Sequence, residues 1–339
     1  MNELTSDEVK MAKDPNADVK ELEQLSKSTS DMVRMLVAGN KSTPLGALAG
    51  LQNDVHEGVL RALAANTSTP CEVLEKLCQN STPSIKCYVA GNPNVNALTL
   101  NKLATNPDVN VRQAVARSGV TSSDILEQLA EDKSHEVRMW VADNKHTAKS
   151  ILRKLASDSN WSVRKCVAGN KQTPAKVLAG LVNMDSAIVD TIARNPSTPQ
   201  ATLLRLVKTT STELRCSIAQ NPGASADLLE QLSQDERSSV RMWVACNKNT
   251  PAHVLTRMYT QSVQNDTIDI NLVVCLLEGG IDLPASELSA LIATYGEEVA
   301  SYVADITEVA YKSVLYRQIV AFGICPKIVN ADLVAKRDH

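Results

Sequence analysis

The fold is decided by one stretch near the middle of the chain, Val163-Arg164-Lys165-Cys166-Val167-Ala168-Gly169-Asn170-Lys171-Gln172-Thr173-Pro174. Similar stretches recur along roughly residues 5–260, and the asparagine gives them a common anchor position. Consecutive anchors lie 26 residues apart, with one step of 25. The anchors are Asn40, Asn66, Asn92, Ser118, Asn144, Asn170, Asn195, Asn221 and Asn247, and Asp14 extends the series one step back. A period held this strictly predicts a solenoid of stacked units.

Each unit reads as two short helices. Apolar residues lie seven and three positions before every Asn or Ser anchor, and an alanine lies two positions before it. This spacing puts them on one face of a helix, and the alanine lets a neighbouring backbone approach closely. Five copies then have Thr-Pro, where we expect the threonine to cap a second helix and the proline to take its first position. Leucine follows eight residues after each of these nine anchors and again at eleven, except at Met258. The apolar face of a single unit would stay exposed to solvent, so the units must stack to bury it.

The recurring pattern V-R-x-x-V-A-x-N-x-x-T-P-x-x-x-L-x-x-L resembles the leucine-rich repeat variant family, which is similar to HEAT and armadillo arrays. The resemblance covers roughly residues 5–260. It implies α-helices alternating with shorter, partly 3₁₀ helices in a right-handed superhelix without a sheet, in a bacterial protein without enzymatic activity. A known member of the family carries an iron–sulfur cluster on an N-terminal cysteine motif. The first cysteine here is Cys71, so that site is not carried over.

The predicted organisation is all-α: about ten two-helix units over residues 1–262 and a helical C-terminal cap over residues 263–339. After Met258 the repeat register is lost, and longer helices are expected from about residue 262 onward. The alternative for this segment is a small functional domain. The fifth unit has Ser118-Gly119 in its turn, where we expect the glycine to supply a left-handed conformation.

Composition limits the class of protein. The 339 residues include 3% aromatic residues and a single Phe, which suits a thin core of Leu, Val and Ala. The polar, acidic N-terminus is unlike a signal peptide, and no apolar run is long enough to span a membrane, so a cytoplasmic location is expected. The eight cysteines show no C-x-x-C pair, and we expect unpaired thiols that act as small hydrophobic residues. A metal or disulfide cluster at Cys71, Cys78 and Cys87 is the alternative.

The most informative charged column lies six residues before the anchor and is basic in seven of nine copies. Its basic members are Arg34, Lys86, Arg112, Arg138, Arg164, Arg215 and Arg241. Stacking would place them in a row, which is either a track for a phosphate backbone or acidic partner, or a structural ladder. Arg138, Arg164 and Arg241 each have an aspartate six residues earlier, able to pair with the arginine or to cap the helix start.

A second column, four residues before the anchor, varies in a way that suggests a partly exposed edge. It contains Tyr88, Trp140 and Trp243, with methionines beside them. Aromatic, methionine and arginine side chains together are typical of protein interface cores. The alternative is that these side chains fill grooves between units.

No catalytic motif, Walker loop, dinucleotide fingerprint or zinc-ligand spacing is present in the sequence, so neither a cofactor nor a metal is predicted. The leading hypothesis is a non-enzymatic scaffold that presents an extended repeat surface to a protein or peptide. The runner-up is nucleic-acid binding along the arginine row, although a net charge of −3 lacks the basicity usual in such proteins. A cryptic enzyme is third. The sequence leaves the partner and the oligomeric state open.

Overall fold

The computed structural model describes residues 6–80, 82–183, 186–208 and 211–264, and every regular element within these ranges is a helix. The all-α prediction is therefore confirmed. The helices alternate as the 26-residue period requires. Odd-numbered helices end at or just before the anchors: α1 Ser6–Lys13, α3 Asp31–Gly39, α5 Glu57–Ala65, α7 Pro83–Gly91, α9 Val109–Arg117, α11 His135–Asp143, α13 Trp161–Gly169, α15 Val189–Arg194, α17 Thr212–Gln220 and α19 Ser238–Ala245. Even-numbered helices carry the leucines: α2 Val19–Leu25, α4 Leu45–Leu51, α6 Cys71–Asn80, α8 Ala97–Ala104, α10 Ser123–Leu129, α12 Lys149–Leu155, α14 Ala175–Leu181, α16 Gln200–Leu206, α18 Ala226–Leu232 and α20 Ala252–Gln264.

The chain divides into two compact units, Met1–Ile188 and Val189–His339. The division falls at the single 25-residue step, where a 3₁₀ helix, η1 (Ser186–Ile188), precedes an α15 of only six residues. Elsewhere in the described ranges the shorter helices are α-helices, which corrects the partly 3₁₀ alternation implied by the family resemblance. The boundary expected at residue 262 stays a prediction, because the cap after it lies almost wholly outside the described residues.

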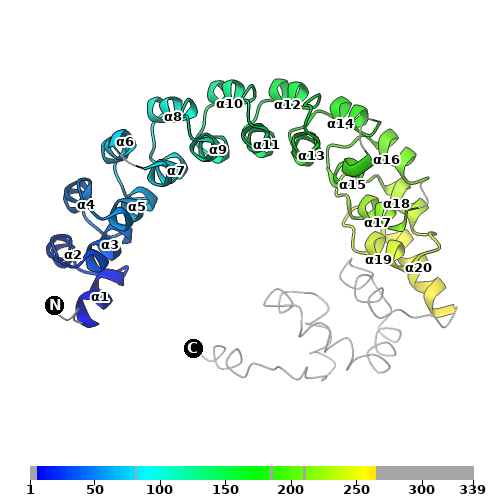
Figure 1. Cartoon of the computed structure of the whole chain (residues 1–339). Coiled ribbons are helices and arrows are strands. Elements are labelled where there is room, and N and C mark those ends of the chain that lie inside the picture. Colours follow the sequence, from blue (N-terminus) through cyan, green and yellow to red (C-terminus); the bar gives the residue numbers. More distant parts are fainter. Residues whose placement is uncertain (1–5, 81, 184–185, 209–210, 265–339) are drawn as a thin grey trace, which may run out of the picture. The chain divides into compact units, whose positions relative to one another are not determined.

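In the first unit, the odd-numbered helices from α3 to α13 lie along the inner side of an arc and the even-numbered helices along its outer side (Figure 1). Consecutive odd-numbered helices pack against one another in chain order, and each even-numbered helix packs against the odd-numbered helix before it. In the second unit, α17 packs between α15 and α19 in the same manner. Contacts between successive repeats are therefore the main source of tertiary structure, as in other solenoids.

The core consists of the columns read from the sequence. Val33, Ala38 and Leu48 are fully buried, and their counterparts in the following repeats are buried too, except the half-buried Leu214. Because the alanine has only a methyl group, the next odd-numbered helix can pack close enough for side chains to reach its main-chain carbonyl. This close approach sets up the polar ladder that joins the repeats.

The anchor asparagines form that ladder, called here the Asn ladder. In seven of these anchors the Asn Nδ2 donates to the carbonyls of the Ala and the anchor of the preceding repeat. For Asn66 these acceptors are the oxygens of Ala38 at 2.8 Å and Asn40 at 2.9 Å. Its Oδ1 accepts from the Ser68 amide at 2.8 Å. The same bonds recur at Asn40, Asn92, Asn144, Asn170, Asn221 and Asn247. A buried amide with three hydrogen bonds to main-chain groups stabilises both the turn and the joint between repeats.

Two local expectations are wrong. The Thr43 hydroxyl donates to the Val37 carbonyl at 2.6 Å instead of accepting from the next helix, and Pro44 occupies the N-cap position of α4. The threonine therefore satisfies the end of one helix and does not cap the start of the other. The anchors adopt extended backbone, with φ −77° and ψ 126° at Asn40 and φ −63° and ψ 132° at Ser118. Gly119 has no left-handed φ either, because the turn needs none.

Among the described residues, no helix combines the length and the apolar character needed to cross a membrane.

Candidate functional site: the arginine row and the inner-helix hollows

Four arginines of the basic row form the same bidentate ion pair. The guanidinium of Arg112 donates from Nε to Asp132 Oδ2 at 2.6 Å and from Nη2 to Oδ1 at 3.0 Å. Its Nη1 donates to the main-chain oxygens of Asn106 at 2.8 Å and Pro107 at 3.0 Å. Equivalent bidentate pairs join Arg34 to Asp54, Arg138 to Asp158 and Arg215 to Asp235. Since each aspartate lies 20 residues after its arginine, every pair joins one repeat to the next. We call this set the Arg ladder.

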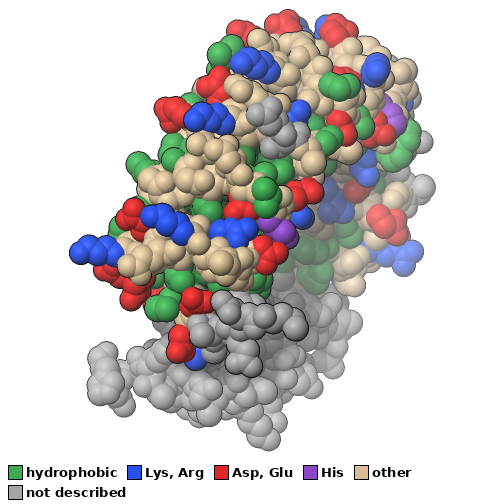
Figure 2. Space-filling view, turned by 60° about the vertical axis from the view of Figure 1, so that its left-hand side comes forward, with side chains coloured by type: hydrophobic (Ala, Val, Ile, Leu, Met, Phe, Trp, Pro, Cys, Tyr) green, Lys and Arg blue, Asp and Glu red, His purple; other side chains and the backbone are tan. Residues whose placement is uncertain are grey.

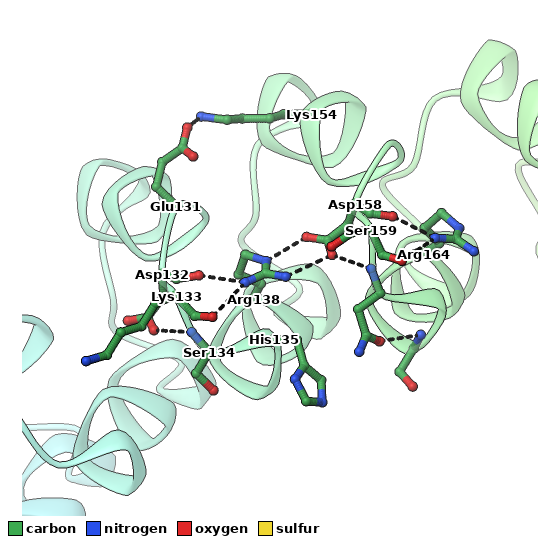
Figure 3. A network of polar contacts seen from close by, with 12 residues as sticks. Glu131, Asp132, Lys133, Ser134, His135, Arg138, Lys154, Asp158, Ser159 and Arg164 are labelled. Atoms are coloured by element: carbon green, nitrogen blue, oxygen red, sulfur yellow. Dashed lines mark hydrogen bonds and ion pairs between the residues drawn. The ribbon is translucent and has the colours of Figure 1, made fainter.

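The Arg ladder is largely withdrawn from solvent. The side chains of Arg112 and Asp132 are 7% and 8% exposed. Figure 3 shows Arg138 directed toward the Asp158 carboxylate and the main-chain oxygens near Asp132, with Arg164 repeating the main-chain contacts one repeat on. Most N–H donors of these guanidinium groups are therefore used within the array.

The electrostatics agree with the geometry. The Arg34 hydrogen bond is the main cause that holds the pKa of Asp54 below its usual range. Burial raises the pKa of Asp132, but the Arg112 hydrogen bond, the Ser134 amide and the positive charges together lower it overall. Each carboxylate therefore stays ionised and binds its arginine across the joint between repeats.

The pairing differs from the one expected. The carboxylate six residues before each arginine does not pair with it. Asp132 gives Arg138 only its main-chain oxygen, at 2.7 Å. Its carboxylate instead pairs with Arg112 and accepts from the Ser134 amide at the start of α11. The prediction that this aspartate interacts with the helix start is therefore correct. Its ion pair is made with the arginine of the preceding repeat.

The other members of the row, Lys86, Arg164 and Arg241, are all half-buried. Arg241 donates to the Asp235 and Glu236 carbonyls in the same way as Arg164 donates to Asp158 and Ser159. Lys86 makes no ion pair among the described residues. Arginine and lysine are not equivalent here, because only the planar guanidinium can serve a carboxylate and two carbonyls at once.

The residues of the aromatic edge lie in two places. Tyr88 on α7 is 44% exposed and Trp140 on α11 is half-buried, both in the first unit. Trp243 on α19, 37% exposed, belongs to the second unit and is treated separately. Of the three, only Tyr88 and Trp140 are placed relative to each other.

Two neighbouring hollows open beside Tyr88 and Trp140. The Tyr88 hollow, about 470 Å³, is lined from α5, α7 and α9 and the turns after them. Its walls include Cys87, Tyr88, Arg117, Ser118 and Gly119. The Trp140 hollow, about 330 Å³, shares Arg117 and Gly119 with the first. It is completed by Trp140, Asp143, Asn144 and Lys145. A volume near 470 Å³ lies within the range of ligand-binding pockets.

Arg117 joins the two hollows. Its guanidinium carbon lies 4.4 Å from the centre of the Trp140 ring. This is a cation–π contact, which contributes about 0.5–1 kcal/mol at an exposed site. Arg117 is exposed and makes no ion pair among the described residues. The sequence reading missed it, although it is the only arginine one position before an anchor within the first unit.

The hollows coincide with the one break in the Asn ladder. Ser118 occupies the fifth anchor position and is 5% exposed, and its Oγ has no hydrogen-bond partner among the described residues. Its short side chain cannot reproduce an asparagine rung. Within the described ranges no side chain donates to the carbonyls of Ala90 or Asn92, the counterparts of the acceptors used by Asn66. The sequence reading noted this unit as irregular but did not connect it to a site.

Several cations border this inner-helix surface. Lys41, Arg61, Lys145 and Lys165 are exposed and form no ion pair among the described residues. Acidic residues such as Glu57 and Asp143 lie among them. Figure 2 shows basic and acidic side chains close together on the face in view, with hydrophobic ones between them. The charge on that face is mixed and is not a continuous basic stripe.

The cysteines give no sign of a metal site in the described part of the chain, where no cluster of three or more candidate ligands occurs. Cys71, Cys78, Cys87, Cys166 and Cys216 are free and half-buried. Burial raises the pKa of the Cys87 thiol, and it raises that of Cys166 to about 11. These thiols therefore stay protonated. Cys246 is exposed at the end of α19 and is disulfide-bonded, so the expectation of unpaired cysteines is wrong there.

No protein-family model matches the sequence, and no curated protein matches it. Among solved structures, the chain is similar to a leucine-rich repeat variant with a novel repetitive structural motif, at 23% identity and a TM-score of 0.38, over 66% of this chain and 79% of that one. The fold is that of a helical-repeat protein. An engineered protein is similar at 17% identity and a TM-score of 0.28, over 93% and 92% of the two chains. Computationally designed armadillo repeat proteins for modular peptide recognition match at 14% identity and a TM-score of 0.15, over 70% and 95%. The family resemblance read from the repeat signature is thus matched among solved structures.

Proposed function

We propose that the chain is a non-enzymatic scaffold that binds an extended peptide segment of a partner protein on the inner, odd-helix side of the first unit. The observation that carries the proposal is the pair of hollows beside Tyr88 and Trp140, with Arg117 between them. Aromatic and arginine side chains contribute most of the binding energy at protein interfaces. Here the aromatic and arginine side chains lie on helices whose opposite faces pack in the core and carry the residues of the two ladders.

The surface is built for a chain in extended form. The repeats present equivalent positions side by side along successive odd-numbered helices, so a peptide lying across them would meet one repeat after another. Tyr88, Trp140 and the half-exposed Trp161 on α13 are spread over several of these helices. Rigid rings on a rigid array lose little conformational entropy on binding, which favours affinity for a flexible segment.

The alternative of nucleic-acid binding along the basic row has less support. In the Arg ladder the guanidinium groups already donate to carboxylates and carbonyls, so a phosphate would have to compete with a bidentate aspartate. The mixed charge around the hollows also differs from the continuous basic surface that a phosphate backbone requires.

Selection of a random peptide library displayed on phage, with the full chain as bait, tests the proposal. Peptides should be enriched, and their synthetic forms should bind the chain with a change in tryptophan fluorescence. Replacing both Tyr88 and Trp140 by Ala should weaken this binding at least about tenfold, while Arg153→Ala on the outer helix α12 should not change it.

Two outcomes would contradict the proposal. One is that no peptide is enriched, or that the enriched peptides bind the double variant as well as they bind the unchanged chain. The other is that an oligonucleotide binds with a steep salt dependence and displaces the peptides, which would favour the nucleic-acid alternative.

A further inference from the structure

Arg117 differs from the arginines of the Arg ladder in having no carboxylate. Arg112, five residues earlier on the same helix, is almost fully buried and bound to Asp132. The Arg117 side chain is exposed, makes no hydrogen bond or ion pair among the described residues, and has its guanidinium carbon over the Trp140 ring. Stacking on a ring leaves the N–H donors at the edge of the guanidinium available. This arginine is therefore oriented for a carboxylate that the described part of the chain does not supply.

The Tyr88 hollow beside it is walled by the irregular anchor of this repeat. Ser118 is 5% exposed, and its hydroxyl oxygen is shielded from solvent and has no partner among the described residues. A buried polar group without a partner is unfavourable, so its presence requires a reason. The Cys87 thiol in the same wall is protonated, because burial raises its pKa, and adds no negative charge.

The departure from the repeat pattern strengthens the case. All other anchors from Asn40 to Asn247 are asparagine, and only the one at the hollow is the smaller serine, followed by Gly119, which faces open space. An asparagine there would fill the floor of the hollow and use its amide within the array. Positions that break a rule obeyed by every neighbouring repeat are expected at functional sites.

The charge around the hollows is mixed, but the cations that line them outnumber the single lining carboxylate. Arg117 lines both hollows and exposed Lys145 lines the Trp140 hollow, without ion pairs in the described ranges. Asp143, which lines the Trp140 hollow, does not form an ion pair with Arg117. From these observations we infer that the Tyr88 hollow binds the carboxylate of an Asp or Glu side chain in the peptide. The Arg117 guanidinium donates to that carboxylate, and Tyr88 packs against the stem of the side chain.

This inference rests on the proposed function, and peptides selected on the full chain provide its test. Each acidic residue of a selected peptide is replaced in turn by Asn or Gln, and affinities are measured for the chain and for Arg117→Gln, Ser118→Ala and Ser118→Asn. One acidic position should matter most, and its replacement should weaken binding about tenfold. Arg117→Gln should cause a similar loss, and combining the two changes should cost little more than either alone.

Ser118→Ala removes only the hydroxyl, which is shielded from solvent, and should leave binding unchanged, whereas Ser118→Asn, which fills the floor, should weaken it about threefold. Arg153→Gln is the matched control, since Arg153 is an exposed arginine on the outer helix α12 with no ion pair in the described ranges. Circular dichroism of each variant checks that the array stays folded.

The outcomes separate the two proposals. If peptides bind through Tyr88 and Trp140 but no acidic residue is coupled to Arg117, the inference is wrong and the scaffold function stands. If no peptide is selected at all, the proposed function is wrong, and the inference that rests on it falls with it. If an oligonucleotide competes with the peptide and its binding depends on Arg117, the anion in the hollow is a phosphate and the acidic-peptide assignment is overturned.

Discussion

Asn144 and Ser118 occupy the same position in successive repeats and leave their surroundings in opposite states. The Asn144 amide donates to the carbonyls of Ala116 and Ser118, at 2.7 and 3.0 Å, and accepts from the His146 amide at 2.9 Å. The Ser118 hydroxyl has no partner among the described residues, and a hollow opens beside it. The backbone is nevertheless almost identical, with φ −65° and ψ 125° at Asn144 and φ −63° and ψ 132° at Ser118.

This comparison shows that the interactions that determine the backbone path differ from those that join neighbouring repeats. Helix periodicity and burial of the Val, Ala and Leu columns set the backbone path, because the turn keeps its shape without the asparagine. Within each unit the Asn ladder, together with the Arg ladder at some joints, then fastens neighbouring repeats. The missing rung at Ser118 is tolerated, and a hollow opens beside it.

The largest expected effect is at the most buried pair of the Arg ladder, which shares its joint with the intact Asn144 rung. Arg112→Met leaves Asp132 and two carbonyls without their donor. We expect a loss of roughly 3–4 kcal/mol in unfolding free energy, measured by urea denaturation. Arg34→Met should cost less, since Arg34 is more exposed and its joint likewise keeps an Asn rung, from Asn66. Equal losses in the two variants would show that burial of the arginine does not set the strength of the pair.

Replacing the anchor side chains themselves sharpens the comparison. Asn144→Ala removes three buried hydrogen bonds and should destabilise the chain by about 2–3 kcal/mol. Ser118→Ala removes a buried hydroxyl that bonds to nothing in the described structure and should cause no loss of stability, because the hydroxyl itself is unfavourable there. Urea midpoints of the two variants, measured side by side, check this. A similar loss from both would mean that Ser118 has a partner after all.

Acid should weaken the Arg ladder specifically. The pKa values of Asp54, Asp132, Asp158 and Asp235 are lowered in the folded chain. The unfolded chain therefore takes up protons first as pH falls, and the stability from these pairs, fully present above the ordinary Asp pKa of about 3.9, is lost below it.

Asp132→Asn should accordingly reduce the drop in urea midpoint between about pH 5 and pH 3 by the equivalent of about 1 kcal/mol. Asp124→Asn, at an exposed position on α10, is the control and should leave the drop unchanged. An undiminished drop in the Asp132→Asn variant would exclude this pair as a source of acid sensitivity.

The last expected effect is a modest gain in stability. Ser118→Asn should complete the Asn ladder by donating to the Ala90 and Asn92 carbonyls, for about 1 kcal/mol of added stability. Thermal unfolding followed by circular dichroism measures it. A loss of stability would indicate that the fifth joint has a different geometry and cannot accept a rung.

The repeat, the helix faces and the buried columns could be predicted because they recur at fixed offsets, and nine copies average out local variation. The partner of each arginine was harder to predict, because bonds between repeats depend on which turn lies beside which helix. Arg34, Arg112, Arg138 and Arg215 each have an aspartate 20 residues later, whereas Leu60 and Lys86 have Asn80 and Asn106 there. That correlation was visible in the sequence, but the earlier aspartate at six residues was as plausible without the stacking geometry.

The hollow was less predictable than the arginine pairs. It arises from the absence of a side chain at Ser118 and from the stacking of Arg117 on Trp140, which lies 23 residues later in the next repeat. Neither follows from the residue type alone. Tyr88 and Trp140 were identified because their column varies, and variation within a repeat is the sequence signal of an exposed position.

Residue-resolved amide hydrogen exchange tests the central claim most directly, namely that each Asn rung locks its turn and that Ser118 leaves one open. The His146 and Ser68 amides donate to Asn144 and Asn66, whereas the corresponding Val120 amide has no acceptor among the described residues. The account predicts slow exchange at His146 and Ser68, fast exchange at Val120, and slowing at Val120 in the Ser118→Asn variant. Equal protection at Val120 and His146 in the unchanged chain would contradict it.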